Sequence, residues 1–218
     1  MMRGVADRTL LLRYKILFWD FDGVIKDSVG VKSDAFERLF TPFGAELAAR
    51  VREHHERNGG MSRYKKLPLY LEWAGREGTA AEVARYSELF SSDVRRAVID
   101  CAWVPGAREY LLANHMLQNF VLVTATPQTE MEDIVRTLGI ERWFRQVHGA
   151  PVAKADAISS TLALLECCRE DALLIGDSQA DHDAAMAAGV DFLLRRTSLN
   201  RELQRMFAGP QCENFSDG

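Results

Sequence analysis

The chain contains 218 residues, of which 47% are hydrophobic and 27% are charged. This composition is close to the globular average, and it excludes a disordered, fibrous or disulfide-stapled protein. The 27 Lys and Arg residues against 31 Asp and Glu give a net charge of −4. Because no basic block is present, we expect no nucleic-acid partner and no binding to an anionic membrane surface.

The cysteine pattern and the N-terminal residues indicate a cytoplasmic protein. The four cysteines form no C-x-x-C pair and are too sparse for a secreted disulfide scaffold. The apolar residues 10–12 are followed at once by Arg13, so no uninterrupted hydrophobic stretch of signal-peptide length is left. The longest uncharged stretch, residues 110–129, carries several polar side chains, and we therefore expect no membrane-spanning segment.

Three short apolar runs predict strands that are buried on both faces of a parallel sheet. They cover residues 16–19, 120–123 and 173–175, lack a polar–apolar alternation and end at a small or acidic residue. Residues 146–148 and 192–194 are weaker strand candidates.

Helix-like stretches separate these strands, at residues 106–116, 130–138, 155–168 and 178–188. A capping box is expected at residues 129–132, and Gly139 and Gly189 are good helix stop signals. Strands that alternate with helices predict an α/β sheet with right-handed crossovers. The tail after Gly209 is expected to be disordered.

The interval 28–103 breaks this alternation, because it contains amphipathic helical patterns and no convincing strand. One of these patterns follows a capping box that Thr79 and Glu82 would form. The sequence therefore predicts an all-helical insert at 28–103 and a catalytic core composed of residues 1–27 and 104–218.

The first predicted strand is followed by Asp20-Phe21-Asp22-Gly23. In a parallel α/β sheet the carboxyl end of a strand opens into the ligand crevice, so both carboxylates are placed for chemistry. One carboxylate can attack a phosphoryl group to form an aspartyl-phosphate, and a second can protonate the leaving oxygen and then deprotonate water. The alternative is that Asp20 and Asp22 only form a turn, as Asp-Gly often does.

The third predicted strand ends in a second acidic segment, in which Asp177 and Asp181 are four residues apart. A helix that starts near Ser178 would bring both side chains towards one crevice. Such an all-oxygen cluster suits Mg²⁺, which keeps waters and substrate oxygens in its coordination shell. The alternative is helix-start chemistry, because the helix dipole stabilises acids near an N-terminus, but it explains one aspartate better than two.

Thr124 and Lys154 complete a phosphate site. Thr124 follows the second clear strand and can donate its hydroxyl to a phosphoryl oxygen, whereas Lys154 can neutralise charge on the nucleophile and the phosphoryl group. Each residue is a weak signal alone, because a single Thr after a strand is usually a turn residue and a single Lys is usually solvated.

Together these residues resemble the four motifs of the haloacid dehalogenase superfamily of phosphohydrolases. The motifs are Asp20-Phe21-Asp22-Gly23-Val24-Ile25, Thr124 after an apolar strand, Lys154, and Gly176-Asp177-Ser178-Gln179-Ala180-Asp181. The similarity extends from about residue 15 to residue 194, and the order and strand-end context of the motifs also match. The helical insert resembles the C1 cap of the phosphoglycolate phosphatase and β-phosphoglucomutase branch.

The resemblance implies a Rossmann-like core and a set of acidic residues with defined roles. Asp20 would be the nucleophile and Asp22 the general acid and base. Asp20, Asp177 and the Asp22 carbonyl would bind Mg²⁺. Asp181 would be a further acid of the metal site, which binds the ion directly or through water.

The same resemblance assigns the residues around the phosphoryl group. Thr124 and Ala125 would bind its oxygens, and Lys154 would neutralise its charge. Ala125 stands where many relatives have Asn, and Lys154-Ala155-Asp156-Ala157 replaces a common Lys-Pro-x-Pro pattern. Neither departure removes a required charge.

Two cationic residues of the insert are predicted to bind substrate. Gly60-Met61-Ser62-Arg63 resembles the substrate-specificity loop of sugar-phosphate members, in which the Arg faces the active site. Lys32 follows the nucleophile by twelve residues, at the position where the mutases commonly have His. The alternative is that Arg63 and Lys32 belong to a solvated surface of the insert.

The leading hypothesis is an Mg²⁺-dependent phosphatase that hydrolyses a small phosphorylated metabolite, such as a sugar phosphate or a phosphoglycolate-like acid, through an aspartyl-phosphate. One alternative is a hexose-phosphate mutase, which Lys32 in place of His disfavours. Another is a catalytically weak binding module on the same fold. We expect a monomer or a homodimer.

Overall fold

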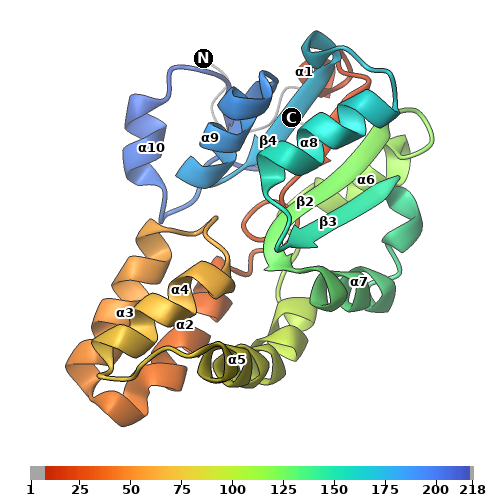
Figure 1. Cartoon of the computed structure of the whole chain (residues 1–218). Coiled ribbons are helices and arrows are strands. Elements are labelled where there is room, and N and C mark those ends of the chain that lie inside the picture. The colour runs from red at the N-terminus through yellow and green to blue at the C-terminus, as the bar shows by residue number, and fades with distance from the viewer. Residues whose placement is uncertain (1–7, 217–218) are drawn as a thin grey trace.

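The computed structural model describes residues 8–216, which form a six-stranded sheet with helices on both faces (Figure 1). The strand order is β3-β2-β1-β4-β5-β6, and every neighbouring pair is parallel. The strands are β1 Ile16–Trp19, β2 Asn119–Pro127, β3 Gln146–Ala150, β4 Ala172–Gly176, β5 Asp191–Arg195 and β6 Gln211–Cys212. The predicted α/β fold with a parallel sheet is confirmed.

Successive residues of the central strand β1 serve two separate hydrophobic clusters. Ile16 and Phe18 pack with residues of α8 and α9, whereas Leu17 and Trp19 pack with residues of α6 and α7 on the opposite face. All four side chains are buried, because a strand covered on both faces needs apolar residues at every position.

The helices that flank the sheet are α6 Ala107–Asn114, α7 Gln128–Thr137, α8 Lys154–Leu164 and α9 Gln179–Ala188, with the shorter α1 Arg8–Leu11 and α10 Arg201–Met206. Short 3₁₀ helices are η1 Thr41–Phe43, η2 Glu141–Trp143 and η3 Arg169–Asp171. Gly189 ends α9 in a left-handed conformation with φ of 70°, as the sequence predicts. Within residues 8–216 no helix combines the length and the apolar character that crossing a membrane requires.

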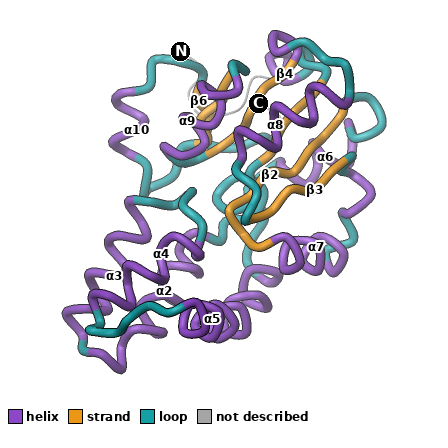
Figure 2. Tube along the Cα trace, in the orientation of Figure 1, coloured by secondary structure: helices purple, strands orange, loops and turns teal. Residues whose placement is uncertain are grey.

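Residues 28–103, between β1 and α6, contain four α-helices, and no strand interrupts them (Figures 1 and 2). They are α2 Val29–Phe40, α3 Ala45–Arg57, α4 Arg63–Trp73 and α5 Ala80–Asp100. Their apolar faces meet in an aromatic core, in which the Phe36 ring lies 4.0 Å from the Phe90 ring and 5.5 Å from the Tyr70 ring, centroid to centroid. The predicted capping box of Thr79 and Glu82 starts α5. We refer to residues 28–103 as the insert.

Two predictions about local structure are wrong. Because β2 continues to Pro127, α7 starts directly after that residue, and the capping box expected at residues 129–132 does not form. The described part of the tail, residues 210–216, is not disordered, because β6 extends the sheet next to β5 and Phe215 is fully buried. The Phe215 ring lies 5.2 Å from the ring of Trp19, so tertiary packing holds a segment whose composition indicates disorder.

Candidate active site

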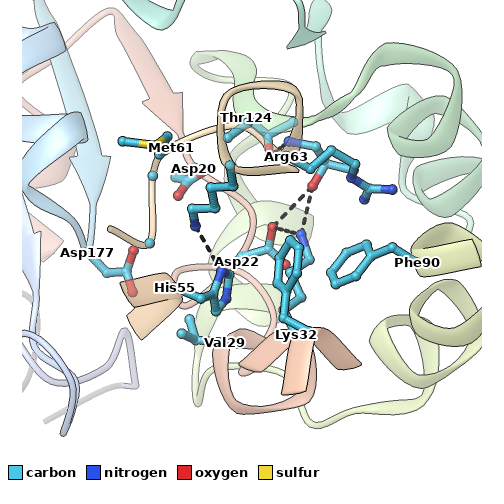
Figure 3. Close-up of a pocket in the computed structure, with 16 residues that line it drawn as sticks. Asp20, Asp22, Val29, Lys32, His55, Met61, Arg63, Phe90, Thr124 and Asp177 are labelled. Atoms are coloured by element: carbon cyan, nitrogen blue, oxygen red, sulfur yellow. Dashed lines mark hydrogen bonds and ion pairs between the residues drawn. The ribbon is translucent and has the colours of Figure 1, made fainter. Parts of the chain in front are cut away.

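The carboxyl ends of β1, β2 and β4 open into one pocket, which the insert covers (Figure 3). Asp20 follows β1, Thr124 belongs to the end of β2, and Asp177 follows β4. The insert contributes the polar side chains Lys32, His55, Arg63 and Lys66 to the pocket wall. The parallel sheet therefore gathers motifs that are more than 150 residues apart in the chain, which is the geometry expected at the carboxyl edge of such a sheet.

Three carboxylates form an acidic cluster at the bottom of this site. One oxygen each of Asp20, Asp177 and Asp181 lie within 4.8 Å of one another. Burial raises the pKa of Asp20 and raises that of Asp177 well above its ordinary value, and the neighbouring carboxylates add to both effects. Among residues 8–216 no hydrogen-bond donor reaches the Asp177 carboxylate. The three carboxylates can supply the oxygen ligands that a divalent cation such as Mg²⁺ prefers.

Lys154 is the first residue of α8, and its ammonium group forms ion pairs with two carboxylates of this cluster. Its buried Nζ lies 2.9 Å from Asp20 Oδ1 and also donates to Asp181 Oδ1. Burial alone would lower the pKa of Lys154, but Asp181 and Asp20 outweigh it and raise that pKa. Lys154 therefore stays protonated beside the predicted nucleophile.

Asp181 has two structural tasks at once. Its Oδ2 accepts hydrogen bonds from the backbone N–H and the hydroxyl of Ser178, at 3.0 and 2.6 Å, and forms a capping box that starts α9. Its Oδ1 accepts from Lys154. The two interpretations of the acidic segment, helix start and active-site cluster, therefore both hold for this residue.

Asp22 lies in a different environment from Asp20, although the two are separated by one residue. Its carboxylate pairs with Lys32 and accepts hydrogen bonds from Ser28 Oγ at 2.5 Å and Thr126 Oγ1 at 3.2 Å. Burial favours the neutral acid, but Lys32 and these two hydroxyls outweigh burial and lower the pKa of Asp22. The structure thus holds Asp22 as an oriented, ionised carboxylate.

Gly23 allows the loop after β1 to reach the acidic cluster. It has a φ of 76°, a conformation that L side chains rarely adopt. A Cβ at this position would also collide with the carboxylate of Asp177. The glycine of the first motif is therefore needed for two reasons, its backbone conformation and its close approach to Asp177.

Thr124 and Ala125 line the pocket beside Asp20, where the sequence predicts phosphoryl binding. Thr124 is buried, and its Oγ1 accepts a hydrogen bond from the backbone N–H of Thr126 at 3.2 Å. This contact leaves the Thr124 hydroxyl hydrogen available to a ligand in the pocket.

Arg63 lines the pocket, but its guanidinium binds another residue of the protein. Nη1 and Nη2 donate to the two carboxylate oxygens of Glu130 on α7, at 2.9 and 2.8 Å. The two side chains are only 4% and 7% exposed, and the guanidinium also stacks 4.6 Å from the centre of the Phe90 ring. Arg63 is thus a link between the insert and the core, and neither Arg63 nor Lys32 belongs to a solvated surface.

Several polar residues of this site were not singled out from the sequence. They are Ser28, His55, Lys66, Thr126 and Glu130. Thr126 shares the strand end with Thr124, and this is the one signal that points to it. The others lie on helices or turns whose sequence pattern does not reveal which polar residue is buried.

The comparison with protein families finds a match over most of the chain. The haloacid dehalogenase-like hydrolase family matches residues 16–194. A phosphoglycolate phosphatase of Pseudomonas fluorescens is 29% identical over 184 residues, which cover 81% of this chain and 67% of that protein. A phosphorylated carbohydrates phosphatase of Thermotoga maritima is 27% identical and covers 80% of this chain and 82% of that protein.

Solved structures share the fold at low sequence identity. CbbY from Rhodobacter sphaeroides, solved in complex with xylulose-(1,5)bisphosphate, gives a TM-score of 0.74 at 15% identity, with 94% of this chain and 96% of that chain covered. A predicted phosphoglycolate phosphatase from Haemophilus somnus gives a TM-score of 0.73 at 17% identity, with the same coverage. The extent of the family match, together with the four motifs at the strand ends, shows that the chain belongs to the haloacid dehalogenase-like hydrolase family.

Proposed function

We propose that the protein is an Mg²⁺-dependent phosphatase that hydrolyses a small phosphorylated metabolite through an aspartyl-phosphate on Asp20. The observation that carries the proposal is the pairing of Asp20 with Lys154 inside a cluster of buried carboxylates, next to Thr124. Such a site offers a nucleophile, a cation to offset phosphoryl charge and a hydroxyl donor. The phosphatase relatives support the same reaction class.

Asp20, Asp177 and the carbonyl of Asp22 are the groups proposed to hold Mg²⁺. When bound, the ion would offset repulsion between the carboxylates and the phosphoryl dianion. The oxygens of Asp181 already accept hydrogen bonds from Lys154 and Ser178, which favours contact through water over direct ligation.

The proposed reaction has two steps at the phosphorus atom. In the first, Asp22 takes up a proton as the phosphomonoester binds, a carboxylate oxygen of Asp20 attacks phosphorus, and the ester P–O bond breaks while Asp22 passes that proton to the leaving oxygen. In the second, Asp22 takes a proton from water, the water oxygen attacks phosphorus, and the bond to Asp20 breaks. Ser28, Thr126 and Lys32 orient Asp22 and stabilise the ionised form that the second step needs.

The insert is proposed to act as a cap over the core formed by residues 1–27 and 104–218. It supplies most of the polar groups that surround the pocket away from Asp20. The reaction type would therefore depend on the core, whereas the choice of metabolite, a phosphoglycolate-like acid or a sugar phosphate, would depend on the cap.

Phosphate release from a panel of phosphorylated metabolites, with Mg²⁺ and after exhaustive chelation, tests this proposal. We expect turnover only with the divalent ion, because the buried carboxylates repel the phosphoryl dianion without it. Full activity after chelation would contradict the metal assignment. Interconversion of a hexose phosphate without phosphate release would favour a mutase, and inertness towards the whole panel would favour a binding module.

A further inference from the structure

Two buried side chains of the insert line the pocket and have no task in the proposed chemistry. Lys66 on α4 is 1% exposed, and His55 on α3 is 4% exposed. Lys66 Nζ lies 2.8 Å from His55 Nδ1. In Figure 3, His55 lies with Val29 and Lys32 on one side of the pocket, across from Asp20 and Thr124.

Lys66 differs from Lys32 and Arg63, the other cations of the pocket, because no carboxylate of the described residues pairs with it. Lys32 pairs with Asp22, and Arg63 pairs with Glu130. Lys66 has no ion pair within residues 8–216, and its hydrogen-bond partner is an imidazole. Burial, together with nearby Lys66 and Lys32, lowers the pKa of His55 well below its ordinary value, so its ring is neutral and accepts at Nδ1.

An ammonium group in this position lacks a counterion. Burial and the charge of Lys32 lower the pKa of Lys66 to about 7, while Asp22 acts weakly in the opposite direction. A charged group that is removed from water is costly unless an opposite charge pairs with it. Because Lys66 lines the pocket, a ligand can supply that charge. An ammonium group on Lys66 donates to His55 Nδ1, and the neutral imidazole then carries its hydrogen at Nε2.

We propose that Lys66 and His55 form a subsite for a second anionic group of the substrate, a carboxylate or a second phosphate on the leaving group. This inference rests on the proposed phosphatase function. It adds a substrate class, phosphate monoesters with a second anion. The core takes the reacting phosphoryl group at Asp20, and the cap recognises the distal anion at Lys66.

The competing explanation is that Lys66 and His55 are only a polar pair inside the insert. The Lys66 ammonium lies 5.9 Å from the centre of the Phe36 ring, which belongs to the aromatic core of the insert. A structural pair of this kind would support folding and would affect all substrates alike. A subsite would discriminate between substrates that differ only in the distal charge.

The test compares kcat/KM for phosphoglycolate and hydroxyethyl phosphate, in which a hydroxymethyl group replaces the carboxylate. Wild-type protein with Mg²⁺ should prefer phosphoglycolate by at least about tenfold, the effect of one charge-assisted contact. Lys66→Met should reduce this preference by about ten- to hundredfold, because it lowers kcat/KM for phosphoglycolate far more than kcat/KM for hydroxyethyl phosphate. Lys65→Met removes the same charge from an exposed neighbour on α4 and should leave the preference unchanged.

A second pair, propanediol bisphosphate and propanediol monophosphate, separates the two possible anions. The pair with the larger Lys66-dependent preference identifies the distal group as a carboxylate or a phosphate. Lys66→Gln removes the charge but keeps a hydrogen-bond donor for His55, and it provides the same comparison if Lys66→Met fails to fold.

Two results would overturn the subsite while leaving the phosphatase function intact. One is a wild-type preference below about threefold for both anionic substrates, far short of a charge-assisted contact. The other is an equal loss on charged and uncharged substrates in both Lys66 variants, as a structural pair would cause. Failure of the wild-type protein to release phosphate from any of these esters would instead overturn the proposed function, and the subsite with it.

Discussion

Asp20 and Asp22 are separated by one residue, yet they meet opposite electrostatic conditions. Asp20 faces two further carboxylates and one lysine, and its pKa is raised. Asp22 faces Lys32 and two hydroxyl groups, and its pKa is lowered. The chain leaves the direction of β1 between the two residues, where the backbone N–H groups of Ile25 and Lys26 donate to the Phe21 carbonyl, and the two side chains meet different partners. Lys154, 2.9 Å from Asp20 Oδ1, opposes this rise in pKa and favours the ionised carboxylate that a nucleophile needs.

Asp20→Asn should abolish both turnover and formation of a phosphoenzyme, because an amide is a poor nucleophile. Asp22→Asn should leave substrate binding largely intact and reduce kcat by about 10²- to 10⁴-fold, the usual contribution of general acid–base catalysis. Steady-state kinetics and trapping of the labelled phosphoenzyme measure these effects. Near-normal activity of Asp20→Asn would contradict the covalent mechanism.

The buried Lys66 predicts a pH dependence of stability. Its pKa is about 7 in the folded protein against 10.5 for an ordinary lysine. Between these values the unfolded chain binds a proton that the folded protein does not bind, so stability rises with pH in this window. The free energy of unfolding of the wild type should increase relative to Lys66→Met by up to about 1.4 kcal/mol per pH unit above pH 7.

Urea unfolding of both proteins at pH 7 and pH 8.5 measures this difference. His55, Lys32 and Asp22 are the titratable groups around Lys66 and are present in both proteins. Lys66 lowers the pKa of His55, but the window above pH 7 lies above the ordinary histidine pKa of 6.5, so the contribution of His55 stays small in both proteins. A pH-independent difference between wild type and variant would show that Lys66 keeps an ordinary pKa.

At the scale of elements, the loop between α3 and α4 sets how closely the insert approaches the core. Gly60 in this loop faces the start of α9, where a Cβ on Gly60 would lie 2.7 Å from the Cβ of Ala180. Gly59 is adjacent, but a Cβ there would meet Ser178 Cβ at 3.8 Å, an ordinary contact. The absence of a side chain at Gly60 therefore allows the insert to close on the first turn of α9.

Gly60→Ala should weaken closure and lower kcat/KM for the natural substrate, because the added methyl group requires the loop or α9 to move. A misplacement of about 1 Å at an active site can cost on the order of 10²-fold. Gly59→Ala is the matched control and should change kcat/KM by less than about twofold, since it adds only an ordinary contact. Equal activity of the two variants would show that the observed approach is not required for turnover.

Across the whole molecule, the Arg63–Glu130 pair connects the insert to α7 of the core. Both side chains are buried, and both carboxylate oxygens of Glu130 take part. Ser91 on α5 adds a hydroxyl contact to the same carboxylate. The pair thus joins two helices of the insert to one helix of the core.

Glu130→Gln should destabilise the protein by about 3–5 kcal/mol, because it leaves the Arg63 guanidinium buried without a counter-charge. The matched control is Asp93→Asn, which breaks the exposed pair of Arg38 and Asp93 within the insert and should cost less than about 1 kcal/mol. Urea unfolding measures both variants. A loss for Glu130→Gln no larger than that of the control would contradict the buried link.

The fold class and the motif residues were predictable because their signals are local. An apolar run that ends at Asp20 or Asp177 identifies both a buried strand and the side chain at its carboxyl end. In a parallel sheet these ends meet at one edge, so the order of elements alone places the motifs together. The family match over residues 16–194 confirms the resemblance that these motifs carry.

Tertiary structure alone decided which polar residues of the insert are buried and which partners they have. The amphipathic pattern predicts helices, but it does not distinguish Lys66, which is buried beside His55, from Lys65, which is exposed. Likewise, nothing in the local sequence couples Arg63 to Glu130, 67 residues away. Such contacts depend on how the insert packs on the core, because burial and pairing of a charge are properties of the assembled surfaces and not of the helix that carries it.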